Sequence, residues 1–258
     1  MMRIEADFMR RVADAAAAQT LPRFRQAGLV TNKLAAGFDP VTEADREAEL
    51  AIRSLIRDTF PDHGILGEEF GAENVGNRHV WVIDPIDGTR AFISGLPLWG
   101  TLVGLTDHGD AVAGMMSQPF TGELFWADDA ASHYDGPGGA RRLATRDTSS
   151  IADATMCTTT PALFTGALRE AYDRLESSVR LARYGTDCYA YAMLAAGNID
   201  LVVETGLQPY DIVALVPIIE RAGGVITTWD GGPAEKAGDI VAAATPALHA
   251  AALEMLNR

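Results

Sequence analysis

The hydrophobic residues of this chain follow two different spacings, and that division constrains its fold more than any other feature. Between residues 79 and 128, short apolar runs are separated by Asp-Gly, Pro and Thr-Gly turn signals, which is typical of sequential antiparallel strands. From residue 154 onward, strand-like runs alternate with helix-like runs, which predicts an α/β arrangement. The expected elements of these two parts are residues 79–84, 99–106, 110–118 and 122–128, then 154–159, 163–175, 178–182, 187–197, 199–204, 210–223, 224–229, 239–244 and a last helix from Pro246.

Two amphipathic helices are expected before the first of these strands. Ile4, Phe8 and Val12 recur every four residues, which places them on one face of a helix that runs to about Thr20. The same kind of period fills residues 43–60, which predicts a second helix. The chain therefore combines α+β and α/β features.

The stretch 133–142 contains three glycines and a proline, and we predict a loop there. A chain of 258 residues is long enough for one large domain or two closely packed lobes. We place the junction of two lobes at this stretch. The first lobe, 1–138, is expected to hold an antiparallel sheet and most metal ligands, and the second, 139–258, to hold Asp211 and the residues that determine substrate specificity.

The charge of the chain opposes several classes of partner. It has 21 basic and 35 acidic residues, a net charge of −14, which disfavours binding to nucleic acid or to an anionic membrane. No apolar run approaches the roughly 20 residues needed to cross a bilayer. Cys157 and Cys188 are too few for a disulfide framework and fit no CxxC spacing. We expect a cytoplasmic protein with no nucleic-acid and no membrane partner.

Acidic residues stand at the ends of three apolar segments. Glu68 and Glu69 follow an apolar pair, Asp84 and Asp87 stand at the carboxyl end of a buried strand, and Asp211 opens a helix. Unpaired carboxylates beside apolar segments are penalised, so such groups are usually neutralised or bound to a metal. This set predicts a site that binds a cation.

The sequence Asp84-Pro85-Ile86-Asp87-Gly88 predicts a turn that brings two carboxylates together. Pro85 presets φ for the second position of a β-turn, which places the Cα atoms of Asp84 and Asp87 within about 7 Å. Carboxylate oxygens with no clustered Cys or His favour Mg²⁺ or Mn²⁺ over Zn²⁺. Such a turn is also common without any metal, so the metal interpretation depends on the whole acidic set.

Four motifs in combination resemble the inositol monophosphatase superfamily of Mg²⁺-dependent phosphomonoesterases. They are PVTEAD at 40–45, ILGEE at 65–69, WVIDPIDGT at 81–89, and VETGLQPYD with the later IIERAGGVIT within 202–227. The resemblance implies a layered αβαβα sandwich of the inositol monophosphatase and fructose-1,6-bisphosphatase type, and a homodimer. It also implies two or three Mg²⁺ ions, replaceable by Mn²⁺, with these ligands: Glu68, Asp84, the backbone carbonyl of Ile86, Asp87 and Asp211.

The resemblance further implies the catalytic roles. Asp45 and Thr89 match the dyad that orients and deprotonates a water, and Glu69 supports the neighbouring ligands. The metals would activate that water and neutralise the phosphate of a small ester in an in-line displacement, with no covalent enzyme intermediate.

Subfamily features favour L-histidinol phosphate as the substrate. The chain reads Thr89-Arg90-Ala91-Phe92 where the common inositol phosphatases continue Asp-Gly-Thr with Thr-Asn-Phe. Together with the segments 185–197 and 207–220, this looks like the histidinol-phosphatase branch, which completes histidine biosynthesis. The alternatives are an inositol-1-monophosphatase, a broader sugar or nucleotide phosphate phosphatase, and, from another class, a noncatalytic metal-binding module.

Five residues are expected to contact the substrate: Gly88, Thr89, Arg90, Asp187 and Glu204. Asp187 and Glu204 would face the ammonium and imidazole groups of histidinol phosphate, and the amides after Gly88 at a helix start would hold the phosphate. Two of these residues also have structural interpretations. Asp187 could be the N-cap of the helix at 187–197, and Arg90 could form a solvated salt bridge.

Overall fold

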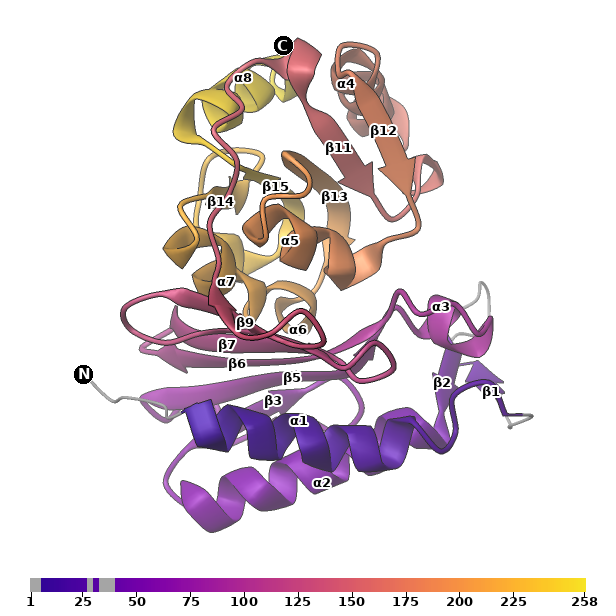
Figure 1. The fold of residues 1–258 in the computed structure, drawn as a ribbon, viewed down its shortest axis with the longest axis vertical. Coiled ribbons are helices and arrows are strands. Elements are labelled where there is room, and N and C mark those ends of the chain that lie inside the picture. Colours follow the sequence, from indigo (N-terminus) through magenta and orange to yellow (C-terminus); the bar gives the residue numbers. More distant parts are fainter. Residues whose placement is uncertain (1–5, 27–29, 33–39) are drawn as a thin grey trace.

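The computed structural model describes residues 6–26, 30–32 and 40–258, which form alternating layers of helices and sheets (Figure 1). Helices α1 and α2 cover one face of an eight-stranded sheet, and α5, α6 and α7 lie between that sheet and a five-stranded sheet. Helices α4 and α8 cover the far face of the five-stranded sheet. The αβαβα sandwich is confirmed. The helices are α1 (Ala6–Thr20), α2 (Glu43–Thr59), α3 (Thr89–Ile93), α4 (Gly166–Glu176), α5 (Asp187–Ala195), α6 (Pro209–Ile212), α7 (Leu215–Arg221) and α8 (Pro246–Leu256).

The eight-stranded sheet has the order β10-β9-β8-β7-β6-β5-β3-β4. Only β3 and β5 pair in parallel; every other neighbouring pair in this sheet is antiparallel. Two further strands, β1 (Val30–Asn32) and β2 (Pro40–Thr42), form a separate antiparallel pair. The bounds of the eight strands are β3 (Gly64–Gly67), β4 (Gly71–Glu73), β5 (His79–Asp87), β6 (Gly100–Asp107), β7 (Asp110–Gln118), β8 (Glu123–Ala127), β9 (Ser132–Asp135) and β10 (Arg141–Arg142).

The five-stranded sheet has the order β12-β11-β13-β15-β14. Strand β11 pairs in parallel with β12 and β13, and β15 pairs antiparallel with β13 and β14. The parallel pairs follow from the alternation of strands and helices that the sequence predicts, whereas β15 follows β14 with no α-helix between them and pairs antiparallel with it. Its strands are β11 (Thr155–Thr158), β12 (Leu181–Tyr184), β13 (Leu201–Leu207), β14 (Val225–Thr228) and β15 (Gly238–Ala243).

Both amphipathic helices of the first layer are confirmed. In α1, Phe8 and Val12 are buried against the sheet, whereas Ile4 lies outside the described residues. Helix α2 begins after Thr42, whose side chain accepts a hydrogen bond from the amide of Ala44 at 3.1 Å. The described residues contain no helix that is both long and apolar enough to span a membrane.

Three sequence-based predictions of local structure were wrong. The stretch 133–142 is not wholly a loop, because the glycines and the proline form only the turn between β9 and β10. The helix expected at 210–223 is divided into α6 and α7, since Pro217 has no N–H to donate to the carbonyl of Val213. The strand expected to stop in a turn after Asp84 continues to Asp87 with a bulge.

The helix pair α6–α7 packs directly on the eight-stranded sheet because glycines leave room for its backbone. A Cβ atom on Gly114 of β7 would lie 2.0 Å from the carbonyl oxygen of Ala214, and one on Gly104 of β6 would lie 2.8 Å from the amide nitrogen of Ala214. These distances are shorter than any relaxed contact, so both strands require glycine here. The same packing places α6, with Asp211, beside the sheet.

We predict that Gly114→Ala destabilises the protein by about 1–3 kcal/mol, because the added methyl group must push the α6–α7 backbone off β7. Urea unfolding measures the change in the free energy of unfolding. Gly76→Ala is the matched control, since a Cβ atom there meets no heavy atom within 4 Å, and its stability should stay within about 0.5 kcal/mol of the parent. Equal stability of the two variants would contradict the direct packing.

Candidate active site

Three carboxylates converge where the end of β5 meets the start of α6. One oxygen from each of Asp84, Asp87 and Asp211 lies within 4.8 Å of the other two. Asp84 is 2% exposed, and its burial, followed by the charges of Glu68, Asp87 and Asp211, raises its pKa well above its usual value. Burial and the charges of Asp187 and Asp211 raise the pKa of Asp87 in the same way. The arrangement is costly when ionised unless a cation lies among the oxygens.

A bulge in β5 puts Asp84 and Asp87 on the same side of the sheet. In a regular strand, residues three apart point to opposite faces. Here Asp84 pairs with Leu102 and Asp87 with Gly100, so three steps along β5 match two steps along β6. Pro85 cannot donate to the ladder, and its carbonyl instead accepts the hydroxyl of Thr101 at 2.8 Å. The predicted closeness of the two carboxylates is therefore correct, but a bulge produces it and not a terminal turn.

Helix starts hold two of these carboxylates. The amide of Cys188, in the first turn of α5, donates to Oδ2 of Asp87 at 2.7 Å. Asp211 lies in the first turn of α6, and its Oδ2 accepts the amide of Gln208 at 2.6 Å. Both bonds orient a carboxylate and leave other lone pairs for a ligand.

Glu68 and Glu69 occupy the turn between β3 and β4. The amide of Glu68 donates to the carbonyl of Ile83 at 3.1 Å, which ties the turn to β5. The Glu68 carboxylate is near enough to raise the pKa values of both Asp84 and Asp45. The structure thus brings Glu68 to the acidic cluster from a third element.

Asp45 and Thr89 come from α2 and α3. Oδ2 of Asp45 accepts the hydroxyl of Thr42 at 2.6 Å and its amide at 2.8 Å, whereas Oδ1 is buried with no hydrogen-bond partner in the described part of the chain. Burial is the main cause that raises the pKa of Asp45 to about 6. The hydroxyl of Thr89 donates to the carbonyl of Ile86 at 3.0 Å. No direct hydrogen bond between Asp45 and Thr89 is among these contacts.

These donors fit a hard divalent cation. The converging groups are carboxylate oxygens that are partly or fully buried, and burial, followed by repulsion from neighbouring negative charges, raises the pKa values of Asp84 and Asp87. A cation would relieve that repulsion and keep all of the carboxylates ionised near neutral pH. The cluster therefore has the chemistry of a metal centre.

A second group of polar residues lies where α5 begins beside β11 and β13. Thr159 donates through its amide to Oε1 of Glu204 at 2.6 Å, and its hydroxyl lies 3.1 Å from that oxygen and 3.3 Å from Oδ1 of Asp187. Burial raises the pKa of Glu204 to about 7, against these hydrogen bonds. Burial also raises the pKa of Asp187, while the charge of Arg90 lowers it. The N-cap of α5 is Thr186, and Asp187 is its first helical residue. The interpretation of Asp187 as the N-cap was therefore wrong.

The α3 side of the cluster contains Gly88 and Arg90. Gly88 has a positive φ of 81° and is the N-cap of α3, so the chain turns sharply after Asp87. Arg90 is exposed in the first turn of this short helix. Its electrostatic interaction with Asp187 spans from α3 to α5.

The sequence analysis missed two charged residues of α2, Glu49 and Arg53. Glu49 accepts the amide of Glu69 at 2.7 Å, and Arg53 donates to Glu49 at 2.7 Å. A signal was present, because both lie on the face of α2 that Ile52 and Ile56 mark as buried. Charged residues on a buried face usually bind a partner.

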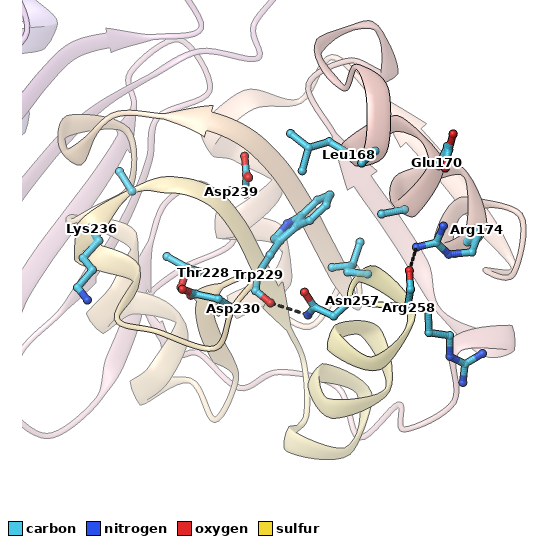
Figure 2. A pocket seen from close by; sticks show the side chains of 14 residues that line it. Leu168, Glu170, Arg174, Thr228, Trp229, Asp230, Lys236, Asp239, Asn257 and Arg258 are labelled. Carbon is cyan, nitrogen blue, oxygen red and sulfur yellow. Dashed lines mark hydrogen bonds between the residues drawn. The ribbon is translucent and has the colours of Figure 1, made fainter.

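A separate cavity of about 610 Å³ lies between α4, α8 and the β14–β15 region (Figure 2). Several of its polar groups already bind the protein itself. Arg174 donates to the carbonyl of Arg258 at 3.0 Å, and Asn257 donates to the carbonyl of Trp229 at 2.7 Å. The acidic cluster therefore remains the better candidate for chemistry.

Comparisons with known proteins agree with this geometry. Residues 6–258 match the profile of the inositol monophosphatase family. The bifunctional phosphatase IMPL2, chloroplastic, of Arabidopsis thaliana is 40% identical over 85% of this chain, which spans 66% of that relative's length. A histidinol-phosphatase of Streptomyces coelicolor is 34% identical, covering 96% of this chain and 94% of its own. The structure of an inositol monophosphatase from Zymomonas mobilis has a TM-score of 0.87 at 37% identity, covering 98% and 97% of the two chains.

We predict that Glu204→Gln flattens the pH dependence of stability of the metal-free protein. The pKa of Glu204 is about 7 in the fold and 4.5 ordinarily, so its stabilising contribution is complete below 4.5 and is lost as pH rises through 7. Between pH 5 and 8 the free energy of unfolding of the wild type should fall by on the order of 2 kcal/mol relative to that of the variant. Urea unfolding at several pH values in EDTA measures this.

The control for this experiment is Glu254→Gln, which changes an exposed glutamate of α8 that pairs with Arg258. Its stability should follow pH as the wild type does. Parallel curves for wild type and Glu204→Gln would contradict the raised pKa.

Proposed function

This chain belongs to the inositol monophosphatase family and is a phosphoric monoester hydrolase, and we propose that it hydrolyses L-histidinol phosphate to L-histidinol and phosphate with Mg²⁺. The observation that carries the proposal is the convergence of Asp84, Asp87 and Asp211 within 4.8 Å, with Glu68 beside them. Members of this family act on small phosphate esters, and the acidic cluster of this chain is suited to bind a phosphate only through cations.

We assign two or three Mg²⁺ ions, replaceable by Mn²⁺, to a set of oxygen donors: Glu68, Asp84, the carbonyl of Ile86, Asp87 and Asp211. When bound, such ions lower the pKa of a water and neutralise the charge of a phosphate. The hydroxyl of Thr89 donates to the Ile86 carbonyl, which would hold that carbonyl in a fixed direction. The carboxylates of Asp87 and Asp211 are already oriented by backbone amides at helix starts.

Asp45 and Thr89 are proposed to handle the proton of the attacking water. The hydroxyl of Thr89 donates its hydrogen bond to the carbonyl of Ile86, so its oxygen can accept a hydrogen bond from the water. Oδ1 of Asp45 is buried and can accept the proton itself, and a pKa of about 6 suits a base that works near neutral pH. Glu69 would support this set through its fixed backbone.

The remaining contacts are proposed to select the ester. The amides that follow Gly88, together with Thr89 and Arg90, would hold the phosphate. Asp187 and Glu204 would accept from the ammonium and imidazole groups of histidinol phosphate. Inositol phosphate is the second candidate, because the same oxygens can accept from sugar hydroxyl groups, and a relative of this fold is an inositol monophosphatase.

Two further properties are part of this proposal. We expect a homodimer, which follows from the family resemblance and which sedimentation equilibrium tests. We also expect the protein to work in the cytoplasm, in keeping with two free, buried cysteines, Cys157 and Cys188.

A phosphate-release assay with both esters tests the substrate. We expect kcat/KM for L-histidinol phosphate to exceed that for inositol 1-phosphate by at least tenfold, about 1.4 kcal/mol. Excess EDTA should abolish both activities, and Mg²⁺ should restore them. A tenfold preference for inositol 1-phosphate would overturn the substrate, and metal binding without turnover of any ester would favour a noncatalytic module.

We predict that Asp87→Asn removes turnover and leaves the metal-free protein at least as stable as the wild type. The change removes a carboxylate that is repelled by Asp187 and Asp211, and the amide oxygen of Asn can still accept the hydrogen bond from the Cys188 amide. Turnover should fall by more than about 100-fold, because loss of a direct metal ligand reduces activity more than loss of a residue that only orients a ligand. Initial rates and thermal unfolding in EDTA measure the two effects.

The matched control is Asp135→Asn in β9, which removes an aspartate that pairs with Arg10 on the surface. Its turnover should equal that of the wild type. Unfolding of Asp87→Asn in the absence of metal would instead indicate a structural role for Asp87.

A further inference from the structure

Glu49 and Arg53 of α2 form a buried ion pair under the β3–β4 turn. Their relative exposures are 0% and 2%, and Nε of Arg53 donates to Oε1 of Glu49 at 2.7 Å. Burying both charges costs hydration free energy that their attraction does not reliably repay. Stability alone therefore does not explain the pair, and its other contacts become informative.

Glu49 binds the backbone of the turn that carries Glu68. Its Oε2 accepts the amide of Glu69 at 2.7 Å, and its Oε1 accepts the amide of Phe70 at 3.3 Å. One carboxylate thus accepts hydrogen bonds from two successive backbone amides at the tip of the hairpin. Because Glu68 directly precedes these amides, the direction of its side chain toward Asp84 depends on them.

Arg53 and Gly67 fix the position of that carboxylate. The guanidinium of Arg53 donates to the carbonyl of Gly71 at 2.5 Å and to Oε2 of Glu73 at 3.3 Å, so it binds both ends of β4. A Cβ atom on Gly67 would lie 1.9 Å from Oε1 of Glu49. Glycine at this position lets β3 lie directly on the carboxylate, which leaves the Glu49 side chain no freedom toward the strand.

We propose that Glu49 and Arg53 are positioning residues that set the affinity of the site for divalent cations, through the backbone of Glu68 and Glu69. The inference rests on the proposed assignment of Glu68 as a metal ligand and is independent of which phosphate ester is hydrolysed. Partners that orient a metal ligand commonly change metal affinity 10- to 100-fold when they are removed. An effect of that size on binding, with little effect on the chemical step, distinguishes positioning from a general loss of structure.

The test is Glu49→Gln, which keeps the shape of the side chain but turns one acceptor oxygen into an NH₂ group that opposes an amide of the turn. We expect the Kd for Mg²⁺, measured by calorimetry without substrate, to rise at least tenfold. At saturating Mg²⁺, kcat should stay within threefold of the wild type. A folded variant whose Mg²⁺ affinity is within twofold of the wild type overturns the proposal.

Two further variants, used as companions to Glu49→Gln, keep the proposal testable if Glu49→Gln folds poorly. Arg53→Lys keeps the charge but loses the forked donor, and Gly67→Ala pushes on the Glu49 carboxylate directly. Both should weaken Mg²⁺ binding by at least threefold, and unchanged affinity in a folded companion overturns the proposal. If none of the three variants folds, the pair is a requirement of the fold, which also overturns it.

The matched control is Asp173→Asn, because Arg169 and Asp173 form an ion pair of the same spacing and the same 2.7 Å distance on the exposed surface of α4. Its Mg²⁺ affinity should be unchanged. Failure of the proposed function has a different signature, since a wild type that binds Mg²⁺ but hydrolyses no phosphate ester leaves the comparison of affinities intact.

Discussion

Repulsion among buried carboxylates is the constraint on which the rest of this structure depends. Asp84, Asp87 and Asp211 place oxygens within 4.8 Å of one another, and Glu68 adds a fourth charge. Burial and the neighbouring negative charges raise the pKa values of Asp84 and Asp87, so these two carboxyl groups hold their protons more strongly than exposed ones do. A divalent cation bound among these oxygens would relieve the repulsion, and it would give the acidic chain a way to hold a phosphate.

The fold resists this repulsion by anchoring the four carboxylates on three parts of the chain: β5, α6 and the turn between β3 and β4. The bulge in β5 turns Asp84 and Asp87 to one side, the starts of α5 and α6 orient Asp87 and Asp211, and α2 holds the turn of Glu68 from below. None of these contacts requires a metal. The site is thus largely formed in the metal-free protein, which lowers the conformational cost of binding a cation there.

Sequence reasoning predicted the layers and the acidic set, but not the contacts that shape the site. Hydrophobic periodicity reports which face of a segment is buried, so α1, α2, the four central strands β5 to β8 and the strands of the five-stranded sheet were accessible to it. Strands β3, β4, β9 and β10 were not predicted, and the order of the layers came from the family resemblance. The bulge at Pro85 depends on pairing with β6, and the close packing of α6 and α7 on the sheet depends on Gly114 of β7, so both require distant partners. The place of Glu49 on the buried face of α2 was a signal in the sequence, but its contacts could not be predicted, because its partners are backbone amides about 20 residues away.

The two ends of the proposed substrate site would attract opposite charges, and this bears on which phosphate ester can bind there. At one end, bound cations would attract a phosphate. At the other, Asp187 and Glu204 share Thr159 as a hydrogen-bond donor, and both have raised pKa values. An ester with a cation opposite its phosphate would ionise these carboxylates fully and gain a charge-assisted hydrogen bond, whereas a neutral polyol would gain only ordinary ones. The carboxylate end would therefore discriminate by charge, which supports the proposal of an amine-bearing phosphate ester over a sugar phosphate.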